Sequence, residues 1–356
     1  MLRNKRFLTL LLPIQIVVIF VLSLFPNFIE KYYSNGIYPY ISSFFRIILG
    51  WIPFSIGDIL LLISFIYILF NFWKFATSKN KKFKKLFFSI FSKLSVIYFF
   101  FYLFWGLNYF RNPLNKTMQL SVPKYNTEEL VLLTEKLLLK TQEIHFKLTK
   151  NDTIPVQTVY TQQELLNKTV FGYENLAKKH PQFNYKFGKV KKSIFSTPMS
   201  YMGFSGYLNP LTGEAQVNYN SMDFNIPATA SHEVAHQIGY ASESEANFIG
   251  FLAAINNEDL LFQYSAYLLA LQYALSNIYR NDKALHLEIK NRLPIGVKKN
   301  LSESYMHWQK YKNPLKPYFH DIYSLFLKAN KQKDGMNSYS KMIGLLMAYE
   351  EKYGLN

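Results

Sequence analysis

One short segment carries residue types and a spacing that could hold and use a metal ion. It reads TASHEVAHQIG and contains H-E-x-x-H, with His232, Glu233 and His236. In a helix, residues four apart project from one face, about 40° from each other and one turn apart, so both imidazoles can bind one tetrahedral ion. Glu233 would then face a water on that ion as general base, which is the arrangement of zinc-dependent peptidases.

The residues around the motif predict the helix that this chemistry requires. Asn225 could cap it, Pro227 falls in its first turn, and Gly239 could end it in a left-handed conformation. The alternative is that the two histidines are capping or core residues. Small and apolar residues at the other positions favour the metal site.

A third ligand is expected from the next helix, where SESEANF offers Glu243 and Glu245. Ser242 and Glu245 fit a capping box, which would leave Glu243 for the metal and give Glu245 a structural role or a bond to a histidine. Glu243 is therefore the favoured ligand and Glu245 the alternative. The chain has no cysteine, so histidine and carboxylate are its only strong ligands for the one Zn²⁺ expected per chain.

The elements around this helix predict an α+β domain that is mostly helical. Asn126 or Thr127 can cap a helix with leucines at helical spacing, and residues 162–179 form another. Residues 183–219 contain short β-prone runs and predict a small sheet with a hairpin turn at 209–213. The remainder after Pro227 has the pattern of successive helices.

Substrate contacts are less specified. An edge strand that pairs with an extended peptide is one interpretation of Glu214, Ala215, Gln216, Val217 and Asn218, and a plain scaffold strand is the other. An oxyanion donor besides zinc is also needed. Its candidates are Tyr201, Tyr207, Tyr240, His320 and Tyr339.

The N-terminal third predicts a membrane domain, residues 1–111, ahead of an extracytoplasmic domain, residues 112–356. Spanning helices are expected at about 7–25, 55–73 and 88–109, where apolar runs are long enough to cross about 30 Å of hydrocarbon. A cleavable signal peptide is the alternative for the first run, but no small-x-small cleavage site follows it.

Charge supplies the orientation. The net charge is +17, and the first 115 residues hold 13 Lys and Arg against Glu30 and Asp58. Basic residues flank the first span and fill the loop between the second and third, which predicts a cytoplasmic N-terminus and a C-terminal domain outside. The partners expected are thus a lipid bilayer and a protein or peptide substrate, with no nucleic acid, because no motif supports that reading.

Four segments resemble a known family. NYFRNPL, GYLNPLTGEAQVN, HEVAHQIGYASESEANF and FLKANKQKDGMNSYSKMIGLL are similar to bacterial membrane proteins of the domain of unknown function 3810, over nearly the whole chain. The resemblance implies a multi-pass protein of the bacterial inner membrane with a periplasmic, zincin-like domain of gluzincin type. In addition, E-x-x-A-N looks like the E-x-x-A-[DN] of CAAX-prenyl-protease-like and IrrE-like metallopeptidases, whose first Glu binds zinc and matches Glu243. Only seven positions separate it from His236, fewer than in those families.

These observations predict a membrane-anchored zinc metallopeptidase that hydrolyses peptide bonds of an envelope or periplasmic protein. A non-catalytic, zinc-stabilised membrane scaffold or binding protein is the alternative, although it would not need Glu233. A transporter is a third class, but three spans with few polar groups offer neither a repeat nor a binding site.

Overall fold

The computed structural model describes residues 2–78, 82–332 and 339–355, and they fall into two compact units. The first unit contains the chain up to Asn112 together with Asn209–Glu214. The second contains Pro113–Leu208 and the chain from Ala215 onward. The loop Asn209–Glu214 therefore leaves the second unit between two of its strands and belongs to the first.

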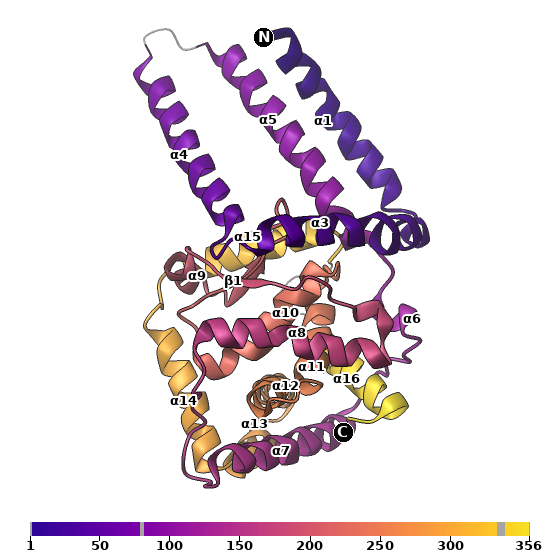
Figure 1. Ribbon diagram of the computed structural model, residues 1–356, viewed down its shortest axis with the longest axis vertical. Coiled ribbons are helices and arrows are strands. Elements are labelled where there is room, and N and C mark those ends of the chain that lie inside the picture. Colours follow the sequence, from indigo (N-terminus) through magenta and orange to yellow (C-terminus); the bar gives the residue numbers. More distant parts are fainter. Residues whose placement is uncertain (1, 79–81, 333–338, 356) are drawn as a thin grey trace. The chain divides into compact units, whose positions relative to one another are not determined.

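Helices make up nearly all of the described first unit. They are α1 (Leu2–Leu22), α2 (Pro26–Phe28), the π-helix η1 (Ile29–Ile37), α3 (Tyr38–Gly50), α4 (Ile56–Thr77), α5 (Phe83–Phe104) and the 3-10 helix η2 (Gly106–Phe110). Among the described residues, α1, α4 and α5 are long and apolar enough to cross a membrane, and α1 packs along α5 (Figure 1).

The three predicted spans are thus confirmed as long apolar helices, with shifted ends. The first begins at Leu2 and stops at Leu22, ahead of Pro26. The third stops at Phe104 and not near residue 109, because a 3-10 helix takes over at Gly106. Most side chains on α4 are exposed although they are apolar, which suits contact with lipid.

The first turn of α4 receives a carboxylate from the loop Asn209–Glu214. Buried Glu214 accepts hydrogen bonds from the backbone N–H of Ile56 at 3.1 Å and of Gly57 at 2.6 Å. Thr212 donates its hydroxyl to the same carboxylate at 2.8 Å. A negative group at a helix N-terminus satisfies amides that have no partner within the helix. Glu214 therefore fixes this loop within the first unit.

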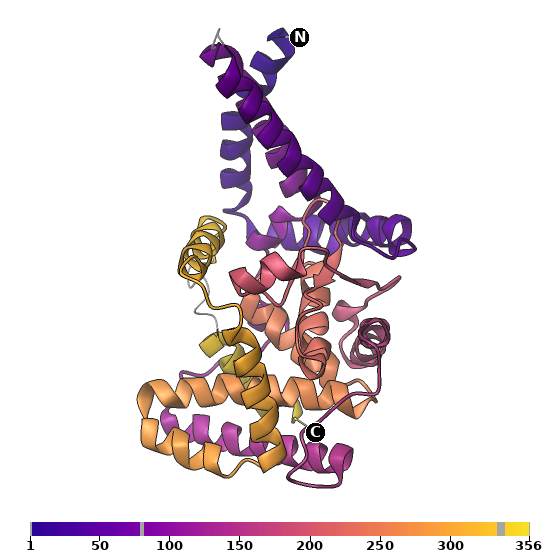
Figure 2. The same ribbon diagram turned by 90° about the vertical axis from the view of Figure 1, so that its left-hand side faces the viewer.

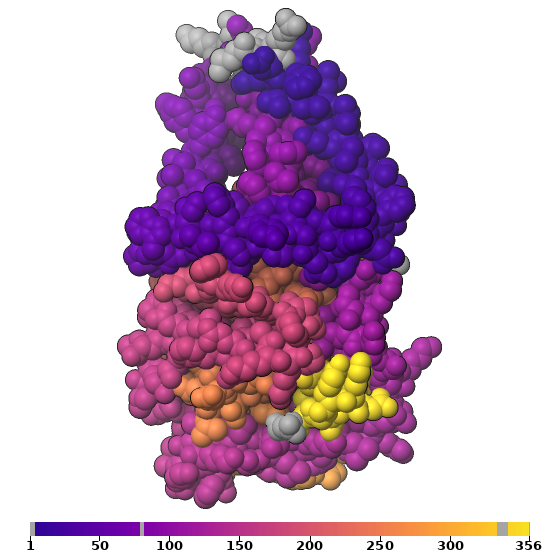
Figure 3. All heavy atoms as spheres, turned by 45° about the vertical axis from the view of Figure 1, so that its right-hand side comes forward, coloured from indigo at the N-terminus to yellow at the C-terminus, as the bar shows by residue number. Residues whose placement is uncertain are grey.

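The second unit is mostly helical, as predicted. Its helices are α6 (Leu114–Thr117), α7 (Thr127–Thr149), α8 (Gln162–Lys179), η3 (Pro181–Phe183), α9 (Ser196–Met202), η4 (Asp223–Asn225), α10 (Ile226–Gln237), α11 (Glu243–Ile255), α12 (Leu260–Asn281), α13 (Lys283–Asn291), α14 (Ile295–Gln309), α15 (Lys316–Ala329) and α16 (Tyr339–Tyr353). The predicted cap at Asn126 is confirmed, since its side chain and Glu129 form a capping box. Helix α16, yellow in Figure 3, packs against α11 and α12.

The predicted small sheet is also present, and it has three strands within the described residues. They are β1 (Val190–Lys192), β2 (Gly206–Leu208) and β3 (Ala215–Val217), in the order β1-β3-β2. Strand β3 pairs parallel with β1 and antiparallel with β2. The edge-strand interpretation of residues 214–218 is therefore wrong, because β3 is central and its backbone is bonded on both sides.

Close contacts between helices centre on α11. A Cβ atom added at Gly250 would lie 2.7 Å from the backbone nitrogen of His232 in α10, which is shorter than real contacts allow. On another side of α11, a Cβ at Gly172 of α8 would lie 2.3 Å from the carbonyl oxygen of Ala253. Two glycines thus let α10 and α8 approach the α11 backbone. This packing places α11 over the predicted metal helix.

We expect Gly250→Ala to destabilise the protein by about 1–3 kcal/mol, because the new methyl group overlaps backbone that cannot move aside. The matched control is Gly344→Ala in α16, where the nearest atom to a new Cβ is a methyl of Val122. Both substitutions favour the helix equally, so only Gly250→Ala should lower the unfolding temperature of the purified full chain. Equal unfolding temperatures for the two variants would contradict the close-packing argument.

Candidate metal centre

Helix α10 is buried along nearly its whole length and carries the H-E-x-x-H motif near its C-terminal end. It begins at Ile226 with Pro227 in its first turn, as predicted. The side chain of Asn225 does not cap it, however, and instead donates to the hydroxyl of Ser304 at 3.1 Å. From α8, the buried hydroxyl of Tyr173 donates to the carbonyl of Ser231 at 2.5 Å. The bond from Tyr173 fixes the backbone of Ser231, the residue that precedes His232.

A tight turn then returns the chain to the same face of α10. Gly239 has φ +96°, a left-handed conformation that favours glycine. Its N–H donates to the carbonyl of His236 at 2.9 Å, and that of Tyr240 donates to Ala235 at 3.1 Å. Helix α11 begins soon afterwards at Glu243 and packs against α10. The left-handed conformation predicted for Gly239 at the end of this helix is confirmed.

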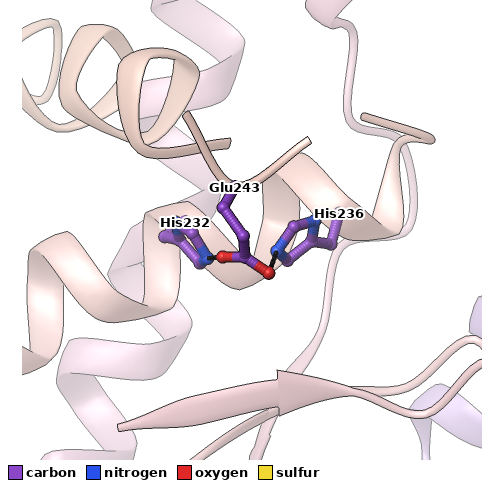
Figure 4. A group of neighbouring side chains, drawn as sticks. All are labelled: His232, His236 and Glu243. Atoms are coloured by element: carbon purple, nitrogen blue, oxygen red, sulfur yellow. Dashed lines mark ion pairs between the residues drawn. The ribbon is translucent and has the colours of Figure 1, made fainter. Parts of the chain in front are cut away.

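Three side chains from these two helices converge on one point. The Nε2 atom of His232 lies 3.3 Å from Oε2 of Glu243, and Nε2 of His236 lies 3.7 Å from its Oε1 (Figure 4). One ligand atom from each residue falls within 4.8 Å of the others. Two imidazole nitrogens and a carboxylate oxygen are a donor set that suits zinc.

Glu243 and Glu245 point in different directions, and only Glu243 faces the two histidines. Glu245 points elsewhere and accepts the backbone N–H of Leu114 at 2.7 Å. Ser242 occupies the N-cap position of α11 without a side-chain bond to the helix, and its hydroxyl meets that of Ser244 at 3.0 Å. The expected capping box is therefore wrong. Glu245 does have a structural role, but it tethers the segment at Leu114.

The Nδ1 and Nε2 atoms of the two histidines have different surroundings. His236 Nδ1 lies 2.7 Å from the carbonyl oxygen of Tyr240. A carbonyl only accepts, so Nδ1 carries a proton, and Nε2 lies on the side of the ring that faces Glu243. The Nδ1 atom of His232 is buried and has no hydrogen-bond partner among the described residues. Both Nε2 atoms are thus directed at the carboxylate, as metal ligands would be.

The charges of His232, His236 and Glu243 shift one another's pKa values. Burial opposes protonation of His236, yet the Glu243 carboxylate raises the pKa of this imidazole to about 9. Burial would likewise raise the pKa of Glu243, but His236 and His232 hold it well below its ordinary value. The cluster therefore has a strong affinity for positive charge, which a bound metal ion would supply in place of protons.

Glu233 lies beside this cluster and is almost fully enclosed, with 4% of its surface exposed. Its Oε2 atom has no partner among the described residues. Burial raises the pKa of Glu233 to about 7, an effect that the two histidines partly offset and Glu243 increases. A Cβ at Gly206 of β2 would lie 2.5 Å from its Oε1, so the strand passes directly over the carboxylate.

Two residues near the site were not singled out from the sequence. Gly206 is one, and Tyr323 of α15 is the other, because its hydroxyl donates to Oε1 of Glu243 at 2.6 Å. Its ring also packs edge-on against Phe204, with centroids 5.4 Å apart. Eighty residues separate Tyr323 from Glu243, and neither position belongs to a motif that links them, so the sequence held no signal for this contact.

The five candidate oxyanion donors have varied surroundings. Tyr240 is buried, acts on His236 through its carbonyl, and packs its ring against Phe183. Tyr201 is exposed and its ring meets Tyr311. Tyr207 lies on β2 and pairs with Gln216, while His320 is exposed on α15. The side chain of Tyr339 lies outside the described residues.

The residues of the predicted substrate strand are buried or hydrogen-bonded within the protein itself. Ala215, Gln216 and Val217 form the buried central strand. The Asn218 side chain donates to the hydroxyl of Ser200 at 2.9 Å and to the carbonyl of Phe204 at 3.0 Å. The strand that lies both at a sheet edge and against Glu233 is β2. The sequence analysis therefore assigned the edge position to β3, the wrong strand of the hairpin.

Comparisons with known proteins return one family. The family model described as "Protein of unknown function (DUF3810)" matches residues 33–347, which include the cluster of His232, His236 and Glu243 as well as Glu233 and Tyr323. No curated protein and no solved structure matches the chain.

We expect purified full-length protein to lose its zinc when His232, His236 or Glu243 is changed to Ala, because each removes one of three protein ligands. Glu245→Ala should retain about one zinc per chain and is the matched control. Elemental analysis of metal per chain measures both. Loss of zinc in Glu245→Ala with retention in Glu243→Ala would contradict the assignment.

Tyr323→Phe should weaken zinc binding about 10–100-fold, because it removes a hydrogen bond that orients the Glu243 carboxylate. Tyr318→Phe is the control, since this tyrosine lies on the same helix with an exposed ring. Competition with a chelator of known affinity measures the change. Equal affinities for the two variants would show that the hydroxyl does not orient the ligand.

Proposed function

The chain belongs to the DUF3810 family of proteins of unknown function, and from its histidine and glutamate cluster we propose that it is a membrane-anchored, zinc-dependent peptidase. The observation that carries this proposal is the convergence of His232, His236 and Glu243 beside the buried carboxylate of Glu233, one oxygen of which has no partner in the described part of the chain. This arrangement supports a zincin-like interpretation of the second unit.

The donor set fits zinc, and a bound ion would act as a Lewis acid and lower the pKa of water at its open position. Glu233 would accept a proton from the attacking water as its oxygen bonds to the scissile carbonyl carbon. The same carboxylic acid would then pass that proton to the amine as the C–N bond breaks. Burial, which raises the pKa of Glu233, makes its carboxyl a better proton acceptor than an exposed glutamate.

A peptide substrate is favoured by strand β2. It lies at the edge of the sheet, and Gly206 brings its backbone against Glu233. An extended peptide could pair with this edge through main-chain hydrogen bonds and present a carbonyl to the metal centre. The absence of a side chain at Gly206 leaves Glu233 room to approach such a substrate.

The first unit would anchor the enzyme in the bacterial inner membrane through α1, α4 and α5. Basic residues concentrate in the first two turns of α1 and around the segment between α4 and α5, and the positive-inside rule favours a cytoplasmic position for these ends. The second unit, which follows the third span, would then be periplasmic. The substrate class expected there is a protein or peptide of the envelope.

A zinc-stabilised scaffold is the other class of function that the same ligands could serve. It would need His232, His236 and Glu243 but would gain nothing from Glu233. A buried carboxyl with an unpartnered oxygen costs stability, and such costs are typical of catalytic sites. This residue therefore favours the enzyme.

Glu233→Gln should retain zinc and lower peptide hydrolysis at least about 10²–10⁴-fold, because the amide cannot take the proton from water. Glu245→Gln is the control, since its remaining oxygen can still accept the N–H of Leu114 and it lies away from the cluster. Cells that express either variant or the wild type would be compared by proteomics of envelope peptides, which also identifies the substrate.

Accumulation of the same uncleaved proteins in Glu233→Gln cells, and not in Glu245→Gln cells, is the expected result. Full cleavage by a zinc-loaded Glu233→Gln protein would overturn the mechanism. Loss of cleavage together with loss of zinc would instead show that Glu233 supports the site structurally.

A further inference from the structure

Helix α15 presents an apolar face that the described part of the second unit leaves uncovered. Tyr318, Ile322 and Leu325 follow each other at helical spacing and lie within about 60° around the helix axis. They are 66%, 64% and 66% exposed, respectively. Figure 2 shows α15, in gold, set to one side of the other helices of its unit. Single exposed apolar residues are common, but three in a row along one helix indicate a binding surface.

The opposite face of α15 is firmly held. Leu327 is fully buried, and Tyr323 donates to Glu243 while its ring packs on Phe204. Near its start, Lys316 runs along Gly203, where an added Cβ would lie 2.4 Å from the lysine Cε. The helix is therefore seated by its inner side, and its outer apolar face is displayed in a fixed orientation.

Charge around this face is strongly positive. Residues 310–331 contain five lysines and one acid, so this segment carries a net charge of +4. The lysines are Lys310, Lys312, Lys316, Lys328 and Lys331, and the acid is Asp321. An apolar helix face flanked by lysines complements the surface of a bilayer that contains anionic phospholipid, where apolar side chains enter the acyl boundary and lysines meet phosphate groups.

Such a surface is always within reach of the second unit. The third apolar helix ends at Phe104 and the second unit begins at Pro113, so residues 105–112 lead from one to the other, and the loop Asn209–Glu214 joins the two units at two further points of the chain. Fully extended, residues 105–112 would span about 27 Å. A short tether gives a high effective concentration of bilayer surface, which favours this partner over a protein that must be met by diffusion.

We propose that α15 is an interfacial helix that docks the metal-binding unit on the bilayer through Tyr318, Ile322 and Leu325. The partner is the anionic phospholipid surface of the membrane that the three spans cross, so the inference rests on the anchoring proposed above. The same helix touches a metal ligand from its inner side. Docking therefore fixes the candidate site at the membrane surface, where substrates close to the bilayer are accessible.

Single-cysteine variants of the full chain test this directly, because the natural sequence contains no cysteine. Nitroxide labels would be placed at Ile322→Cys and Leu325→Cys, and the protein reconstituted in nanodiscs of phosphatidylethanolamine and phosphatidylglycerol. Leu287→Cys on α13 is the matched control, a leucine exposed to 56%. Ile63→Cys in α4 reports on the spans. Power saturation with oxygen and with a water-soluble nickel chelate then separates lipid, water and protein surroundings.

The expected result is an oxygen-to-nickel accessibility ratio at 322 and 325 that is several-fold above that at 287 and below that at 63. Nickel accessibility at 322 and 325 equal to that at 287, with 63 in lipid, would overturn docking and leave the anchoring intact. Low accessibility to both reagents at 322 and 325 would show a protein partner or a second copy and overturn the proposal. A water-exposed label at 63 would refute the anchoring and the docking together.

Discussion

The candidate site depends on how closely α11 can approach α10. His232 and His236 come from one helix and Glu243 from the other, so the spacing of the two backbones sets every distance between ligand atoms. Gly250 permits that spacing, because any side chain there would strike the backbone at His232. The turn at Gly239 sets the direction in which the chain enters α11, and the hydroxyl of Tyr173 in α8 holds α10 by a hydrogen bond to the carbonyl of Ser231. A site built this way is positioned by rigid elements, which is what tight geometry at a metal centre requires.

The same packing buries groups that are costly to bury. Glu233, Glu243 and the two histidines lie in one enclosed cluster, where the imidazoles and the Glu243 carboxylate lower the cost of burial for each other. Glu233 gains less, since burial raises its pKa to about 7 and one oxygen has no described partner. A fold under selection for stability alone would replace such a carboxyl with an apolar side chain. Its presence is better explained by the proton transfer proposed for it than by packing.

Local patterns in the sequence predicted what depends on neighbouring residues. The ligand face of α10, the capping box at Asn126 and the bounds of α8 each follow from residues within one or two helical turns. Features that join distant segments were missed or misread. Glu245 fits a capping box by spacing, but its carboxylate instead accepts a hydrogen bond from the N–H of Leu114, 131 positions away. The position of residues 214–218 in the sheet was misread for the same reason, because the partners of β3 on both sides are fixed by tertiary pairing and not by its own residues.

Helices α4 and α15 both expose apolar side chains, but for different physical reasons. Helix α4 has 22 residues, about 33 Å at 1.5 Å per residue, which matches the thickness of a bilayer core, and nearly all of its side chains between Asp58 and Asn71 are apolar. Helix α15 has 14 residues, about 21 Å, and is apolar on an outer face while its inner face holds Tyr323 on Glu243. It is too short to span and too one-sided to lie within hydrocarbon, whereas the membrane interface proposed for it suits both of its faces. Helix α15 would then serve two functions: its inner face orients Glu243 through the hydroxyl of Tyr323, and its apolar outer face contacts the membrane.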